Sequence, residues 1–243
     1  MDAEIREIYD GSKGRYGSPK ITRELQDRGH RVSKNRVARR MRDAGLRSKV
    51  RRKYRVTTDS KHQFPVAPNL LARDFTAEVP DKVWVSDITY LATRTGWLYL
   101  TVIIDLFSRM VIGWALSSSL SHEMVVAALK RAVRKRRPGK GLVFHSDRGV
   151  QYACTDFRKE LGKYGFIQSM SRKGNCWDNA VAESFFGIMK TELVYHEKYE
   201  GHQDTLHSIF EYIEAFYNRE RRHSTLGYLS PVEYEKLKLK ICA

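Results

Sequence analysis

The stretch that decides the fold runs from residue 83 to residue 116 and reads VWVSDITYLATRTGWLYLTVIIDLFSRMVIGWAL. It predicts three strands, over 83–92, 97–106 and 110–116, because β-branched and aromatic residues dominate each run. Only short turns separate these runs, the first of them containing Gly96. Strands joined by so few residues are antiparallel neighbours. The sequence therefore predicts a three-stranded antiparallel meander in the middle of the chain.

Helices and single short strands alternate after this meander. Apolar residues at helical spacing mark the helices, and brief apolar runs mark the strands. The expected helices cover 122–137, 156–164, 178–195 and 203–217, and the expected strands cover 142–146 and 166–170. Ser230-Pro231-Val232-Glu233 forms a capping box with proline at the first helical position, which predicts a last helix. This order is that of a ribonuclease-H-like α/β fold, a mixed five-stranded sheet with flanking helices whose fourth strand is parallel to the first.

The first 45 residues predict an all-α module. One amphipathic helix covers 4–11, a second begins at Ser18-Pro19, and a third, basic helix covers 34–44 behind the cap residue Ser33. Two short helices joined by a tight turn, the second of them basic, are typical of a helix-turn-helix that reads DNA. A basic helical hairpin that enters no groove is the alternative. The residues that we expect to contact DNA from this module are Lys34, Asn35, Arg36, Arg39 and Arg40.

Positive charge is concentrated at the same end of the chain. The sequence holds 44 Lys and Arg against 28 Asp and Glu, a formal charge of +16, and residues 1–62 hold 19 of the basic and 8 of the acidic residues. Such an excess predicts a polyanionic partner, above all nucleic acid, although a merely basic protein is the alternative. Residues 46–80 read as a basic, proline-containing linker that follows phosphates, with Arg51, Arg52 and Lys53 as contacts.

Composition excludes several other classes of protein. The chain is 42% hydrophobic and 30% charged, which is typical of a globular protein. No apolar run approaches the ~18 residues that span a bilayer, and the acidic start is unlike a secretory signal. Cys154, Cys176 and Cys242 lack the paired spacing of a disulfide framework or a zinc site. The unpaired cysteines fit a reducing compartment, so we expect a cytoplasmic protein with no membrane partner.

Three carboxylates stand out by their context. Asp87 lies inside the first apolar strand, Asp147 ends the fourth strand, and Glu183 lies in the long helix. A charge inside an apolar strand is costly unless it is compensated, and a shared divalent cation compensates several carboxylates at once. Oxygen ligands favour Mg²⁺ or Mn²⁺, and two ions about 4 Å apart support an in-line phosphoryl displacement. Ordinary surface acids at strand ends are the alternative for each residue taken alone.

Further polar residues are expected to line a DNA path beside these acids. Lys190 shares a helix face with Glu183 and Asn179 and is placed to hold a phosphate. Arg172 and Lys173 lie in the loop before that helix. A basic cluster of Arg219, Arg221 and Arg222 is expected to contact phosphates as well.

Three other residues invite a functional interpretation. Asp105 also lies in an apolar strand, but its place before a turn favours a structural role. His145 either orients a carboxylate or is a satisfied structural histidine. We interpret Trp177 as a core anchor rather than as a ring that stacks on a base near the cut.

The spacing of the acids resembles the DDE motif of the retroviral integrase superfamily. There are 59 residues between Asp87 and Asp147 and 35 between Asp147 and Glu183, with Lys190 seven residues further on. The surrounding sequences narrow the resemblance to the IS3-family transposases, OrfB product. They are WVSDITY (84–90), HSDRGVQY (145–152), DNAVAESFF (178–186) and YNRERRHSTLGY (217–228).

The resemblance implies Mg²⁺-dependent strand cleavage and strand transfer at insertion-sequence ends, in which a 3′-hydroxyl attacks without a covalent enzyme–DNA intermediate. It implies that Asp87, Asp147 and Glu183 are metal ligands and that Lys190 contacts DNA. The implied partners are terminal inverted repeats and target DNA, other copies of the chain in the synapse, and an upstream OrfA-type protein or frameshift fusion. The implied location is the bacterial cytoplasm, at the nucleoid. The expected divisions are a helix-turn-helix (1–45), a linker (46–80), a catalytic core (81–195) and a helical C-terminal extension (196–243).

Two other functions compete with this interpretation. A catalytically silent DNA-binding regulator would bind element ends without strand transfer under any divalent metal. A ribonuclease-H-type hydrolase that acts on hybrids would have no use for the helix-turn-helix or for the face that carries Lys190.

Overall fold

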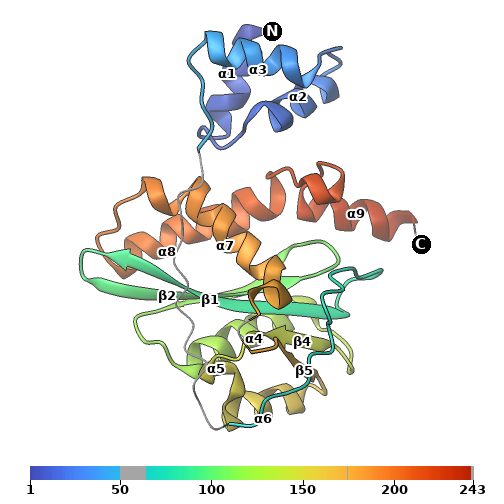
Figure 1. Ribbon diagram of the computed structural model, residues 1–243, viewed down its shortest axis with the longest axis vertical. Coiled ribbons are helices and arrows are strands. Elements are labelled where there is room, and N and C mark those ends of the chain that lie inside the picture. The colour runs from blue at the N-terminus through green and yellow to red at the C-terminus, as the bar shows by residue number, and fades with distance from the viewer. Residues whose placement is uncertain (50–63, 174, 242–243) are drawn as a thin grey trace.

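The computed structural model describes residues 1–49, 64–173 and 175–241, and the linker residues Arg51, Arg52 and Lys53 lie outside them. Figure 1 shows an N-terminal helical module joined to an α/β core. No helix in the described part of the chain is long and apolar enough to cross a membrane.

The N-terminal module consists of α1 (Asp2–Gly11), α2 (Ser18–Asp27) and α3 (Lys34–Asp43). Helix α2 begins with a proline in its first turn, and the Ser33 side chain accepts a hydrogen bond from the backbone nitrogen of Arg36 at the start of α3. Buried apolar residues of the three helices pack together: Ile5, Ile8, Ile21, Leu25, Val37 and Met41. The predicted all-α module is confirmed.

The core is a mixed five-stranded sheet in the order β3-β2-β1-β4-β5. Its antiparallel meander is β1 (Val83–Thr93), β2 (Gly96–Asp105) and β3 (Val111–Ser117). Strand β4 (Val143–Ser146) is parallel to β1 and to β5 (Ile167–Met170). The expected fold class is therefore confirmed, including the parallel fourth strand beside the first.

Neighbouring residues of β1 point into different halves of the core. Trp84 packs with helices α4 (His122–Arg136), α5 (Val150–Ala153) and α6 (Thr155–Lys163), whereas Val85 belongs to the cluster that contains α7 (Ala180–Glu192). In Figure 1 these two groups of helices cover opposite faces of the sheet. The residues of β1 that follow are thereby held between two packed layers.

Helix α4 approaches β3 so closely that only glycine fits at position 113. A Cβ atom there would lie 2.5 Å from the backbone oxygen of Ala128 and 2.8 Å from the Cβ of Ala132. Atoms at such separations overlap, so this contact fixes the identity of the residue.

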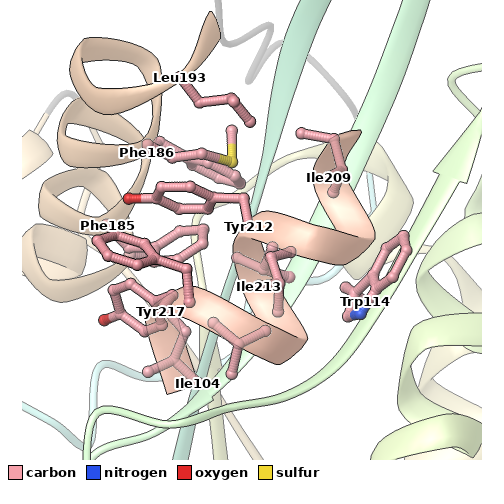
Figure 2. Packing of buried hydrophobic residues seen from close by; sticks show 14 of the residues in the cluster. Ile104, Trp114, Phe185, Phe186, Leu193, Ile209, Tyr212, Ile213 and Tyr217 are labelled. Carbon is pink, nitrogen blue, oxygen red and sulfur yellow. The ribbon is translucent and has the colours of Figure 1, made fainter. Parts of the chain in front are cut away.

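The C-terminal helices complete the second layer. Helix α8 (His202–Phe210) continues into a π-helical segment, η3 (Glu211–Tyr217), where the sequence predicts one regular α-helix over 203–217. Figure 2 shows aromatic side chains of η3 against those of α7, and the rings of Phe185 and Tyr217 meet edge to face. The wider turn buries four side chains of η3: Tyr212, Ile213, Phe216 and Tyr217.

The last helix, α9 (Pro231–Ile241), begins with the predicted capping box. The Glu233 carboxylate accepts from the backbone nitrogen of Ser230 at 2.8 Å, and the Ser230 hydroxyl accepts from the backbone nitrogen of Glu233 at 3.3 Å.

Ion pairs join the N-terminal module to the C-terminal part of the core. Lys20 lies 3.4 Å from the Glu192 carboxylate, and Arg222 pairs with Glu24 and Asp27 of α2. The Tyr16 hydroxyl accepts a 3.0 Å hydrogen bond from the backbone nitrogen of Arg222. The module therefore packs against the region around α7 and the segment after η3.

Candidate active site

Asp87 and Asp147 occupy corresponding positions on adjacent parallel strands. Ser86 of β1 pairs with Ser146 of β4, and each aspartate is the next residue in its strand direction. Neighbouring strands lie about 4.8 Å apart, so the two carboxylates start from adjacent backbone positions. The structure thus brings these two predicted residues together.

Short local hydrogen bonds orient both aspartates. The backbone nitrogen of Ile88 donates to Asp87 Oδ1 at 2.8 Å, and that of Gly149 donates to Asp147 Oδ1 at 2.9 Å. A Cβ at position 149 would lie only 3.0 Å from Asp147 Oδ1, so glycine leaves the room that this turn needs. Both carboxylates are half-buried.

Three buried hydroxyl groups, which hydrogen-bond to one another, lie beside the two aspartates. The Ser86 hydroxyl donates to the backbone oxygen of Val102 at 2.8 Å and lies 2.9 Å from the Tyr152 hydroxyl. Tyr152 also lies 3.3 Å from the Thr101 hydroxyl. Burial raises the pKa of Tyr152 well above its ordinary value, and the charges of Asp87 and Asp147 raise it further, so the phenol remains protonated.

Asn179 ties the start of α7 to this edge of the sheet. Its Nδ2 atom donates to the backbone oxygen of Ser86 at 3.0 Å, directly before Asp87. Glu183 follows one helical turn later on the same side of the helix. Its carboxylate is exposed, whereas Lys190, two turns beyond Glu183, is half-buried. Asn179 shares the helix face of Glu183, as the sequence predicts, and its buried side chain anchors that face to β1.

The acids act on one another electrostatically. Burial raises the pKa of Asp87 well above its ordinary value, and the charges of Asp147 and Glu183 raise it further. The charge of Lys190 lowers the pKa of Asp87, while burial lowers the pKa of Lys190 itself. All four predicted groups thus influence one site, where concentrated negative charge favours a cation.

The donor set fits a hard divalent cation. Carboxylate oxygens are the ligands that Mg²⁺ and Mn²⁺ prefer. The Oδ1 atom of Asn179 is also buried here and accepts no hydrogen bond from the described residues. Within those residues, no three His, Cys, Asp or Glu side chains lie close enough together to hold a metal ion. A set of three carboxylate ligands remains a prediction.

Comparisons with known proteins place the chain in a family. Integrase core domain families match residues 77–176 and 183–239, and an HTH-like domain family matches residues 1–54. An uncharacterized 31 kDa protein of insertion element IS600 from Shigella sonnei is 43% identical over 97% of this chain and 87% of its own length. The InsF transposase for insertion sequence IS3A from Escherichia coli K12 is 41% identical over 98% of this chain and 83% of its own length. The chain belongs to the IS3 family of transposases.

Solved structures agree with the fold of this transposase. The intasome of simian T-cell lymphotropic virus, in complex with PP2A regulatory subunit B56 gamma, is similar over 95% of this chain and 74% of that chain, with a TM-score of 0.55 and 14% identity. The HTLV-2 integrase catalytic core domain in complex with magnesium, in a trimeric form, is similar over 65% of this chain and 97% of that chain, with a TM-score of 0.50 and 15% identity. The transposase therefore has an integrase-like core.

Asp105 has the structural role that its position before a turn predicts. Its Oδ1 atom accepts from the backbone nitrogen of Phe107 at 2.9 Å, and its Oδ2 atom accepts from that of Asp81 at 2.9 Å. Arg136 lies 3.3 Å from Oδ2. The carboxylate is fully buried and holds together the turn after β2 and the segment before β1.

His145 is a satisfied structural histidine, one of the two interpretations that the sequence leaves open. Its Nδ1 atom lies 2.8 Å from the Ser169 hydroxyl, and its Nε2 atom lies 3.3 Å from that of Ser171. Burial lowers the pKa of His145 to about 4, so the ring is neutral at pH 7.

The interpretation of Trp177 as a core anchor is wrong. Trp177 lies in the 3₁₀ turn η1 (Cys176–Asn179), and 68% of its surface is exposed. The two polar residues that follow it, Asp178 and Asn179, are the buried ones. The sequence signal near this inversion is the pair Asp178-Asn179 directly before α7, where Asn179 occupies the N-cap position.

Most of the predicted DNA contacts of the transposase lie at its surface. On α3, the side chains of Lys34, Asn35, Arg36, Arg39 and Arg40 are exposed, and Arg40 also pairs with Asp2. Arg172 and Lys173 are exposed before α7, and Arg219 is exposed after η3.

Two predicted phosphate contacts do not fit their positions. Arg221 is buried, and its guanidinium lies 2.8 Å from the buried Glu192 carboxylate. Arg222 is half-buried and holds Glu24 and Asp27. Both arginines bind acidic residues that lie far away in sequence, so they join parts of the chain instead of facing solvent.

Proposed function

We propose that this transposase cleaves and joins DNA strands at insertion-sequence ends, with Asp87, Asp147 and Glu183 as the catalytic carboxylates. The observation that carries the proposal is the pairing of Ser86 with Ser146, which sets the two aspartates side by side. The hydrogen bond from Asn179 to Ser86 adds the helix that bears Glu183.

Asp87 and Asp147, with Glu183, would hold two divalent cations. Mg²⁺, or Mn²⁺ in its place, supplies Lewis-acid activation of an attacking 3′-hydroxyl or water and of the leaving oxygen when bound. The HTLV-2 integrase core was solved in complex with magnesium, which supports this choice. The ionised carboxylates are the forms that bind a cation, so the raised pKa of Asp87 makes cation binding dependent on pH.

Other residues position the DNA. The exposed basic residues of α3 bind the terminal repeat and fix its register, and Lys190 holds a phosphate near the reacting bond. The reaction exchanges one phosphodiester for another without a covalent enzyme intermediate, so correct placement of the strand supplies much of the catalysis. Other copies of this chain and an upstream OrfA-type protein complete the assembly.

Strand-cleavage assays test this function. We would incubate the protein, with and without the upstream protein, with labelled element ends and Mg²⁺, and measure nicked and joined products. Asp87→Asn, Asp147→Asn and Glu183→Gln are expected to abolish both products and to leave DNA binding nearly intact. Asp156→Asn, which changes a 66% exposed carboxylate on α6, is the matched control and should retain activity.

Each outcome decides between functions. Metal-dependent cutting by Glu183→Gln would contradict the assignment of the site. Tight binding of ends without products from the unaltered protein, under any divalent metal and with the upstream protein present, would favour a silent regulator. Preferred cutting of RNA–DNA hybrids would favour a hydrolase.

A further inference from the structure

Trp177 has the most exposed side chain of the four tryptophans in the chain. Trp84 and Trp114 are buried, whereas Trp177 is 68% exposed and Trp97 is 59% exposed. Trp97 lies in β2 at the far end of the β1–β2 hairpin, with its ring edge to face against Tyr90. Leaving a large aromatic ring in water forgoes the favourable free energy of burying it. An exposed ring beside a candidate active site therefore calls for a specific explanation.

The backbone that carries Trp177 is held firmly. Asp178, the next residue, is fully buried and accepts hydrogen bonds from the backbone nitrogen and guanidinium of Arg172 at 2.8–2.9 Å. It also accepts from Arg73 at 3.0 Å and from Asn69 at 2.9 Å. These contacts hold the pKa of Asp178 well below its ordinary value, so this carboxylate stays ionised at neutral pH. The Trp177 ring is therefore attached to a backbone that the Asp178 hydrogen bonds hold in place.

The same backbone segment places Trp177 beside the candidate active site. Asn179, two residues later, donates to the backbone oxygen of Ser86, which directly precedes Asp87. Two residues span at most about 7.6 Å between Cα atoms, so the backbone of Trp177 stays close to that edge of the sheet. Arg172 and Arg73 keep 55% and 46% of their side chains exposed although both bind Asp178. An aromatic ring, two half-exposed arginine side chains and the acidic site therefore lie together.

We propose that Trp177 stacks on an unpaired base of the DNA strand next to the reacting phosphate, while Arg172 and Arg73 contact the backbone of that strand. Aromatic rings surrounded by basic side chains bind single strands in this way, and each stacked base contributes about 1–3 kcal/mol to the binding free energy. Both faces of a base pair inside a duplex are covered by its neighbours, so beside the scissile phosphate the ring selects ends that are open or frayed. This inference rests on the proposed function, because it places the strand at the catalytic carboxylates.

Binding measurements on two probes test the proposal. One probe is a blunt duplex of the element end, and the other is the same duplex with the nucleotides beside the scissile phosphate left unpaired. Trp177→Ala is expected to weaken binding of the unpaired probe by about 5- to 150-fold and to change binding of the blunt probe little. Trp177→Phe should restore most of the loss, and Trp97→Ala, the matched exposed control, should bind both probes like the unaltered protein.

Tryptophan fluorescence gives a second readout that does not need catalysis. Stacking on a base quenches indole emission, so the unpaired probe should quench the Trp97→Ala protein and should quench the Trp177→Ala protein much less. An equal loss of affinity for both probes, or no loss for either, would overturn the proposal. A change of oligomeric state in Trp177→Ala without the probe-selective loss would assign the ring to a protein contact instead.

Failure of this inference is distinct from failure of the proposed function. Asp147→Asn lacks a catalytic carboxylate, yet it should retain the quenching by the unpaired probe. If the unaltered protein cuts DNA while Trp177→Ala binds both probes normally, the function stands and the stacking role falls. If stacking is observed but no products form, the function falls.

Discussion

Replacing Arg221 with methionine is expected to destabilise the fold, and the reason lies in the buried pair that it forms with Glu192. The Nε atom of Arg221 donates to both carboxylate oxygens at 2.8 and 3.1 Å, and Nη2 donates at 2.8 Å. The two side chains are only 7% and 8% exposed. Methionine fills a similar volume, so the change removes the charge with little loss of packing.

The magnitude follows from the partners that Glu192 keeps. Removal of one member of a buried ion pair costs about 3–5 kcal/mol, because the other charge stays buried without compensation. The Tyr212 hydroxyl, at 2.8 Å, and the Lys20 ammonium, at 3.4 Å, still contact the carboxylate. We therefore expect the lower end, about 3 kcal/mol, which lowers the melting temperature of a chain of this size by about 6–12 °C.

Thermal and urea unfolding of three variants and one control measure this effect. Arg221→Met and Glu192→Gln should each lose stability, and the double variant should lose less than the sum of the two because neither member of the pair leaves the other's charge uncompensated. Arg219→Ala, which removes an exposed arginine two residues away, should change stability by less than about 0.5 kcal/mol.

DNA binding separates this role from the phosphate contact that the sequence predicts. A phosphate contact would make Arg221→Met bind element ends more weakly, with a salt dependence lower by about one unit of slope. We expect the slope of the folded variant to be unchanged. Normal stability together with a reduced slope would refute the structural assignment.

Other perturbations give equally direct tests. Burial, aided by the charges of Arg221 and Lys20, lowers the pKa of His223 to about 3 from 6.5, so the native state keeps this ring neutral. Its contribution to stability is complete above pH 6.5 and is lost as the pH falls toward 3. His223→Gln should therefore reduce the change in unfolding free energy over that pH range by about 4–5 kcal/mol. Gly113→Ala should cost about 1–3 kcal/mol in urea unfolding through overlap with α4, whereas Gly139→Ala, with open space around its Cβ, should be nearly neutral. Lys190→Ala should weaken binding of element ends and lower the salt slope by about one, and an unchanged slope would argue against a phosphate contact.

The elements of the core could be predicted from sequence because their patterns are local. The expected strands over 83–92 and 97–106 differ by a single residue at an end from Val83–Thr93 and by one at each end from Gly96–Asp105. Alternating burial and β-branched residues report directly on a sheet, whereas the π-helical segment Glu211–Tyr217 changes only the backbone spacing within an apolar run. Its sequence looks the same in an α-helix, so the periodicity predicts a regular one.

The candidate site was predictable in part for the same reason. Asp87 interrupts an apolar strand and Asp147 directly follows one, and strand order is enough to bring them together. The roles of Arg221 and Arg222 depend on partners elsewhere in the chain. Glu192 lies 29 positions from Arg221, and Glu24 lies 198 positions from Arg222. A run of basic residues reads identically in solvent and in a buried network, which is why sequence assigned both arginines to DNA.

Helix α7 links the two functions that the sequence treats as separate. Near its start it carries Glu183, one turn after the anchor Asn179, and at its end it carries Glu192. Glu192 binds Lys20 through its carboxylate and Lys49 through its backbone oxygen, and both lysines come from the N-terminal part of the chain. The two glutamates lie nine positions apart on the helix, a rigid distance of about 14 Å. The N-terminal module is therefore connected through one helix to the proposed catalytic carboxylates, and the buried charges at the end of that helix fix the register between them.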